Sequence, residues 1–157
     1  MQKADYLNYV GRVRNTKRIG ILYNIPRDHL DKVVKHISKI DDVLSVNINN
    51  YCTPSTIKRY LVQTYSDIQW EEKHKEHCWL MFLSQVQENS KVMVFNGAET
   101  LTKTGLDFVD ELENENVPVI LISSNSRFYP RLRKRTDYFR KVMIELDYKE
   151  VNQTTTR

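Results

Sequence analysis

Cysteine, glycine and proline are all scarce in this chain. Its 157 residues include 2 cysteines, 4 glycines and 4 prolines. Two cysteines do not make the disulfide framework of a small secreted protein, and so few glycines and prolines leave no low-complexity linker. Also missing are any apolar run of the roughly 20 residues that cross a membrane and an apolar signal-peptide core at the start. We therefore expect a cytoplasmic protein with no membrane segment.

What the chain does contain is ordinary for a globular protein. Hydrophobic residues make up 40% and charged residues 28% of the sequence, as in typical soluble domains. This length is enough for one domain with a sizeable core. We expect a single domain over residues 1–150 and a disordered polar tail over residues 151–157.

The positive charge is concentrated near the C-terminus. The net charge of the chain is +4, but the segment 127–141 alone carries +6, so the remainder carries −2. The bases of that segment are Arg127, Arg131, Arg133, Lys134, Arg135, Arg140 and Lys141. Such a segment indicates an anionic partner, most often nucleic acid; the alternative is a solvated helix face.

Aromatic residues are interleaved with these bases. Phe128, Leu132 and Phe139 have helical spacing and are expected on the buried side, whereas Tyr129 could stack on unpaired bases of DNA. A second basic group lies near the N-terminus and consists of Lys3, Arg12, Arg14, Lys17 and Arg18. Arginine and lysine would contact phosphates with little sequence preference. The two groups could share one edge if the first and last strands are neighbours.

Strand and helix patterns alternate along the chain. The apolar patterns predict strands over 19–23, 43–48, 91–95, 117–122 and 142–146. They predict helices over 5–14, 28–40, 53–65, 70–88, a stretch from Thr102 or Thr104 through Leu112, and 127–141. Asp28 is expected to cap its helix, and Leu7 and Leu80 are expected to face inward. The alternation predicts an α/β three-layer sandwich around a mostly parallel five-stranded sheet.

The order of segments from about Tyr6 to Tyr148 resembles the AAA+ and related P-loop ATPases, most closely the transposition helpers of the Mu and Tn7 type. Tyr23-Asn24-Ile25-Pro26 is similar to the entry of a phosphate-binding loop, and Lys91 to Leu101 to a Walker B strand with its turn. Val119 to Asn125 resembles a sensor 1 strand, and Ser126 to Leu132 a loop that often carries an arginine finger. The resemblance implies strand order 5-1-4-3-2 and self-association.

The chemical residues of that family are missing. The stretch 24–31 contains no glycine, and Leu30 and Asp31 occupy the places of the P-loop Lys and Ser/Thr. Asn96-Gly97 stands where Asp-Glu would hold Mg²⁺ and polarise water. We therefore predict no ATP hydrolysis, no cofactor and no metal, with a degenerate nucleotide site formed by Asn24, Pro26, Arg27, Leu30, Asp31, Asn96, Gly97 and Asn125. The alternative is an unrelated α/β fold in which 24–31 is only a connection.

Other catalytic arrangements are poorly supported. Cys52, His74, His77 and Cys78 could suggest zinc, but adjacent His77 and Cys78 point to different sides of a helix. The acidic pairs Asp41-Asp42 and Glu71-Glu72 fall at element boundaries, where acids cap helices or aid solubility. We expect no enzyme.

Two functions remain as hypotheses. The first is a non-hydrolysing AAA+-like protein from a phage or mobile element that binds DNA through the basic C-terminal helix. The second is a protein-interaction module that docks on an ATPase or another partner and supplies Arg127 or Arg131 to it. Partners on these hypotheses are DNA, a second copy of the chain, or another protein.

Overall fold

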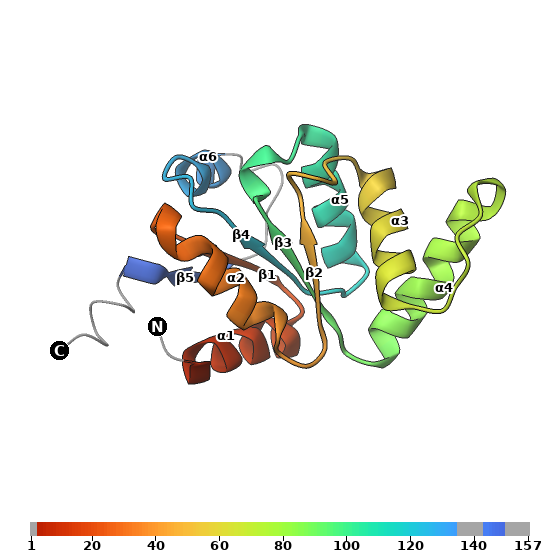
Figure 1. Cartoon of the computed structure of the whole chain (residues 1–157), viewed down its shortest axis with the longest axis horizontal. Helices are drawn as coiled ribbons and strands as arrows, with labels where there is room; N and C mark the ends of the chain where they lie inside the picture. Colours follow the sequence, from red (N-terminus) through yellow and green to blue (C-terminus); the bar gives the residue numbers. More distant parts are fainter. Residues whose placement is uncertain (1–2, 135–142, 150–157) are drawn as a thin grey trace.

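The computed structural model describes residues 3–134 and 143–149, so Arg135, Arg140, Lys141 and the expected tail lie outside the described residues. The helices are α1 (Lys3–Thr16), α2 (Leu30–Ser38), α3 (Pro54–Tyr65), α4 (Lys75–Glu88), α5 (Lys103–Asn114) and α6 (Phe128–Lys134). The strands are β1 (Ile19–Tyr23), β2 (Val43–Asn47), β3 (Val92–Asn96), β4 (Val119–Ile122) and β5 (Ile144–Asp147). Figure 1 shows their arrangement.

The five strands form one parallel sheet in the order β2-β3-β4-β1-β5. Read from β5, this is the predicted order 5-1-4-3-2, and the predicted fold class is confirmed. The first and last strands are neighbours, with Gly20 opposite Ile144 and Ile120 on its two sides.

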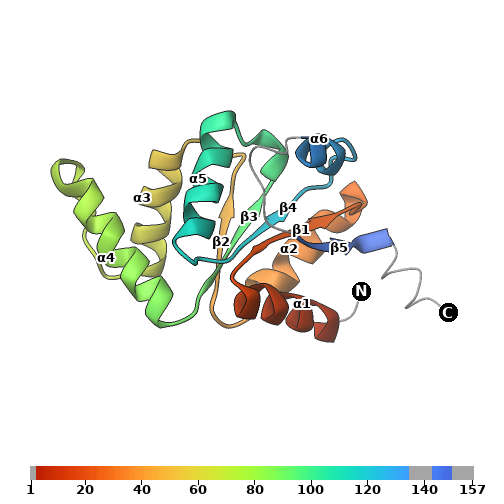
Figure 2. The ribbon, with the colours of Figure 1, turned by 180° about the vertical axis from the view of Figure 1, so that it is seen from behind.

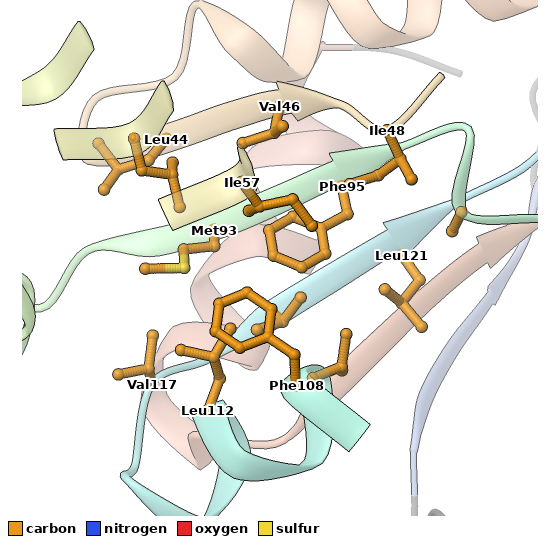
Figure 3. Packing of buried hydrophobic residues seen from close by; sticks show 14 of the residues in the cluster. Leu44, Val46, Ile48, Ile57, Met93, Phe95, Phe108, Leu112, Val117 and Leu121 are labelled. Atoms are coloured by element: carbon orange, nitrogen blue, oxygen red, sulfur yellow. The ribbon is translucent and has the colours of Figure 1, made fainter. Parts of the chain in front are cut away.

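Helices cover both faces of the sheet and make three layers (Figures 1 and 2). Buried side chains of α1 and α2 pack on one face, among them Tyr9, Val13 and Ile37. Side chains of α3, α4, α5 and α6 pack on the other face, where Phe95 of β3 meets Phe108 of α5 (Figure 3). No helix of the described residues is long and apolar enough to cross a membrane.

Local sequence explains where two of the helices begin. Thr53 caps α3 and forms a reciprocal capping box with Thr56, and Pro54 occupies the first turn, where its missing N–H costs nothing. Of the two threonines that could cap α5, Thr102 is the one that does so: its hydroxyl oxygen accepts a hydrogen bond from the Gly105 N–H. Each cap satisfies backbone donors that the first helical turn leaves without partners.

Several expected details differ. Asp28 does not cap α2; it lies in a 3-10 turn, Arg27–His29, and the position before α2 is His29 without a side-chain cap. Residues 70–88 divide into a 3-10 turn, Glu72–His74, and α4. Leu7 and Leu80 are exposed rather than buried, at 47% and 63%, because the neighbouring Tyr6 and Trp79 occupy the inward positions.

Residues other than glycine occupy most of the left-handed turn positions of the described chain. Lys17, Asp42, Ser90 and Asn116 have positive φ, and each lies one to three residues before a strand. A side chain at such a φ costs about 1 kcal/mol, which glycine avoids. The scarcity of glycine therefore leaves avoidable strain at the amino-terminal edge of the sheet.

One glycine is required for the packing of α1 on the sheet. A Cβ at Gly20 of β1 would lie 2.6 Å from the Tyr9 hydroxyl oxygen and 2.7 Å from Cγ2 of Val13. The Tyr9 hydroxyl passes over Gly20 and donates to the Ile144 carbonyl oxygen at 2.8 Å. Gly20 thus leaves room for the hydrogen bond from Tyr9 of α1 to Ile144 of β5.

Candidate functional site

The turn after β1 differs from a phosphate-binding loop. Asn24 has φ 59° and its Nδ2 donates to Oδ1 of Asp147, 3.1 Å away on β5. Pro26 supplies no N–H, and its carbonyl oxygen accepts the His29 N–H. The following Arg27 and Asp31 are exposed, and Leu30 packs against the core. The turn is therefore held to β5 by a side-chain hydrogen bond. It lacks the glycines that let the backbone N–H groups of a P-loop surround a phosphate.

A stacked pair of tyrosines lies at the carboxyl end of β1. The rings of Tyr23 and Tyr129 are 4.0 Å apart with planes 9° apart, so α6 packs on the end of the strand. Burial, and next a hydrogen bond to Glu145, raise the pKa of Tyr129. Tyr129, predicted to stack on bases, already has an intramolecular ring partner in this structure.

Two buried oxygens mark the position that resembles Walker B. Oδ1 of Asn96 and Oε2 of Glu99 are buried and have no hydrogen-bond partner in the described part of the chain. The turn between them begins at Gly97, whose φ is 75°, and continues as a 3-10 turn, Ala98–Thr100. This turn leaves one oxygen of Glu99 buried, which the sequence alone did not establish. The sequence offers one carboxylate here in place of the Asp-Glu pair.

Asn125, at the sensor-like position, serves the backbone of its own loop. Its Oδ1 accepts the Arg127 N–H at 2.9 Å, and its N–H donates to Oγ of buried Ser123 at 3.0 Å. These bonds shape the start of α6. Asn125 is exposed, so the described contacts give it a loop-forming role.

The structure brings part of the two predicted basic groups together. Arg12 of α1 and Arg18, which lies between α1 and β1, line one hollow of about 570 Å³ with Arg133 of α6. Glu145 of β5 is the acidic residue of this lining, and its Oε1 accepts from Nη1 of Arg133 at 3.0 Å. The four ionised side chains carry a net charge of +2. We call this site the β5 hollow.

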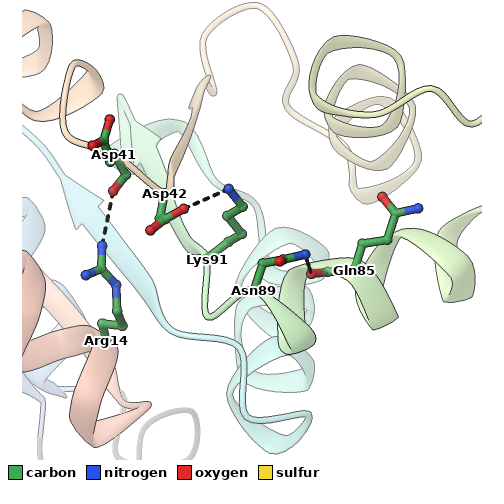
Figure 4. A network of polar contacts seen from close by, with 6 residues as sticks. All are labelled: Arg14, Asp41, Asp42, Gln85, Asn89 and Lys91. Carbon is green, nitrogen blue, oxygen red and sulfur yellow. Dashed lines mark hydrogen bonds and ion pairs between the residues drawn. The ribbon is translucent and has the colours of Figure 1, made fainter.

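The remaining described bases divide between two places. Arg127, Arg131 and Lys134 are exposed on or beside α6, near the β5 hollow. Arg14 and Lys17 instead line a separate hollow with Lys91, at the amino-terminal ends of β1, β3 and β4. There Arg14 Nη2 donates to the Asp41 carbonyl oxygen, as Figure 4 shows. Only part of the N-terminal basic group therefore shares an edge with α6.

Several residues considered for metal or nuclease chemistry have other partners in the structure. Cys52 is exposed, whereas Cys78 is buried with its Sγ donating to the Gln69 carbonyl oxygen at 3.4 Å. Lys91 lies 2.8 Å from Asp42 and, through that hydrogen bond, lowers the pKa of the Asp42 carboxyl (Figure 4). Within residues 3–134 and 143–149, no three His, Cys, Asp or Glu side chains gather as metal ligands.

A third groove, of about 550 Å³, lies between α3, α4 and α5. Lys58 crosses it, with Nζ 5.5 Å from the ring centre of Trp79 and 5.4 Å from that of Phe108. Both rings are more than 90% buried, so Lys58 covers a part of the core rather than an open aromatic cage. Sequence reasoning did not identify this groove, because its residues come from three separate helices.

Comparison with known proteins identifies the fold. No protein-family model and no curated protein matches the chain. Among solved structures, it is similar to a Walker-type ATPase of Pyrococcus abyssi, with a TM-score of 0.67, 14% identity and 93% of this chain covered. The match spans 53% of that chain, about half its length. The class that these observations define is an α/β domain with a P-loop ATPase-like fold.

Proposed function

We propose that this chain is a non-hydrolysing, ATPase-like domain that binds nucleic acid through a basic face at the β5 edge. The observation that carries the proposal is the β5 hollow, where arginines of α1, of the α1–β1 connection and of α6 line one hollow beside further exposed bases. The described bases of this face are Arg12, Arg18, Arg127, Arg131, Arg133 and Lys134. They come from segments more than 100 residues apart, which the parallel β1–β5 pairing brings together.

The proposed partner is the phosphate backbone, with no preference for base sequence. Arginine binds phosphate oxygens through two parallel donors, and a face of several arginines releases counterions from nucleic acid. Four to five phosphate contacts predict that log K falls against log salt with a slope of about −4 on duplex DNA. Tyr129 contributes to the fold of this face through its stack on Tyr23.

The proposed lack of ATP hydrolysis rests on the residues at the carboxyl edge. No lysine follows β1 in the stretch 24–31, and the turn is tied to β5 through Asn24 and Asp147. Asn96 is neutral, so it supplies no charge to orient Mg²⁺. An origin in a phage or mobile element belongs to the same proposal and is supported by the sequence resemblance alone.

Charge reversal tests the proposal. Arg18→Glu with Arg131→Glu should weaken binding of a fluorescent 20-base-pair DNA by at least about ten-fold and reduce the salt slope by about 2. The matched control is Lys73→Glu with Lys103→Glu, which makes the same charge change on exposed residues of the 3-10 turn before α4 and of α5. An equal loss of DNA affinity in both variants would show that only the net charge of the protein matters. That result would contradict binding at a defined face.

The second candidate is a module that docks on an active ATPase subunit. Leu80 and Met81, 63% and 43% exposed on α4, favour it, because exposed apolar side chains are common at protein interfaces. Under this candidate, Leu80→Lys abolishes co-purification with the ATPase and leaves DNA binding unchanged. The charge-reversal pair on the basic face separates the two candidates by what is lost. The first candidate predicts loss of DNA binding, and the second predicts loss of the complex with the ATPase, to which Arg131 would be supplied.

A further inference from the structure

Glu145 is the feature of the β5 hollow that its proposed role in phosphate binding does not explain. It is an acid on the strand at the edge of the sheet, among Arg12, Arg18 and Arg133. A face evolved only to attract phosphate would gain from a neutral residue at this position, since a carboxylate repels a phosphate nearby. Its side chain is 32% exposed, so it lies partly within the hollow rather than in bulk water.

The contacts of Glu145 resemble those that a phosphate would make. Its Oε1 accepts from Nη1 of Arg133 at 3.0 Å, the distance of a charge-assisted hydrogen bond. Burial raises the pKa of the Tyr129 phenol, and the nearby Glu145 carboxylate raises that pKa further. The Arg133 guanidinium lies 5.7 Å from the centre of the Tyr129 ring, so one carboxylate, one guanidinium and one phenol form a compact cluster.

We infer that the Glu145 carboxylate occupies the position of a nucleic-acid phosphate and competes with it for Arg133. This inference rests on the proposed function and adds a regulatory element to it. In the free protein Arg133 is held by Glu145, and on binding it exchanges that carboxylate for a phosphate oxygen. The exchange keeps the face from binding tightly to every anion, because each ligand must first displace the internal one.

The expected effect follows from the exposure of the pair. The Arg133 side chain is 61% exposed, so the ion pair is of the surface type, worth up to about 1 kcal/mol. Glu145→Gln should therefore raise affinity for DNA by about five-fold, which is the same energy expressed as a ratio. Because the gain in affinity acts through Arg133, it should disappear in the Arg133→Ala background. There, the chain with Glu145 and the chain with Glu145→Gln should bind DNA equally.

The matched control is Glu72→Gln. Glu72 forms the other exposed Arg–Glu pair of the described chain, with Oε1 3.7 Å from Nη1 of Arg59. It lies before α4, at the end of the molecule opposite β5 (Figures 1 and 2). The two variants make the same change in net charge, so any difference between them reports the position of the acid.

Fluorescence polarisation with a 20-base-pair DNA, and thermal-shift titration with inorganic pyrophosphate, form the two arms. A five-fold tighter binding of Glu145→Gln than of Glu72→Gln, lost with Arg133→Ala, supports the inference. Equal affinities of the two variants overturn it, even if the wild-type chain binds DNA. If no form of the protein binds DNA, the proposed function fails, and the pyrophosphate arm still decides the inference: Glu145→Gln must bind pyrophosphate more tightly than Glu72→Gln. If Glu145→Gln does not fold, Glu145→Thr, which suits a strand, replaces it.

Discussion

The contact of Tyr9 with Gly20 allows the most direct calculation from this structure. Replacing Gly20 by alanine would place a methyl group 2.6 Å from the Tyr9 hydroxyl oxygen and 2.7 Å from Cγ2 of Val13. Normal contact distances begin near 3.5 Å, so α1 must shift by about 1 Å. Neither neighbour yields easily, because the Tyr9 ring is buried and valine is stiff at χ1.

Two costs combine in Gly20→Ala. Overpacking a core by one methyl costs about 1–3 kcal/mol, and a displaced Tyr9 leaves the Ile144 carbonyl oxygen without its donor, for about 1–3 kcal/mol more. We expect the free energy of unfolding to fall by about 3 kcal/mol in urea titrations followed by circular dichroism. In a double-mutant cycle, Tyr9→Phe should relieve part of this cost, by about 1 kcal/mol, because it removes the nearest atom.

Gly11→Ala is the matched control. Gly11 lies in α1, and a Cβ there would meet nothing within 4 Å. This substitution should raise stability by about 0.5–1 kcal/mol, since glycine inside a helix is destabilising. If Gly20→Ala leaves the free energy of unfolding within 0.5 kcal/mol of the wild-type value, the reasoning about α1, β1 and β5 is refuted.

Three further predictions concern stability. Burial raises the pKa of Tyr6 from 10.0 to about 12 and that of Tyr9 further. Both phenols keep their protons to higher pH in the folded state than in the unfolded state. Their contribution to the free energy of unfolding is therefore complete below pH 10 and is lost as the pH rises from 10 toward 12, by about 1.4 kcal/mol per pH unit for each phenol. Tyr6→Phe should make this loss of stability with pH less steep in urea titrations at several pH values. Ser90→Gly should stabilise the chain by about 0.5–1 kcal/mol, because Ser90 has φ 52°, whereas Ser84→Gly on the exposed face of α4 should destabilise it by a similar amount in the same titration. Thr53→Ala should lower the melting temperature by the equivalent of about 1 kcal/mol through loss of the α3 cap, and an unchanged melting curve would contradict the capping role.

The fold was predictable because its strands are short apolar runs that alternate with amphipathic helices. Ile19 to Tyr23 contains no polar residue before its final tyrosine, which is typical of a strand covered on both faces. The sheet order came from the family resemblance, since no local pattern contains it. Which side of each helix is buried was harder to predict. Leu7 and Leu80 fit an apolar stripe of their helices, but their larger neighbours Tyr6 and Trp79 take the buried positions.

The candidate site was predictable only in part. Charge counting found Arg12, Arg18 and Arg133, and the parallel pairing of β1 with β5 explains why they meet. It could not find the Glu145–Arg133 pair or the Tyr23–Tyr129 stack, because in each case the two side chains belong to different elements that meet only in the folded chain. It also placed Arg14 with Arg12, whereas Arg14 lines a separate hollow at the amino-terminal ends of β1, β3 and β4.

The most direct test of the account is a salt series of DNA binding by the purified protein, with and without ATP and Mg²⁺. Fluorescence polarisation with single-stranded and duplex DNA would measure the dissociation constant from about 50 to 200 mM salt. The account predicts binding that weakens steeply with salt, is the same with or without ATP, and is accompanied by no phosphate release. Absence of binding at 50 mM salt, or binding that depends on ATP hydrolysis, would contradict it.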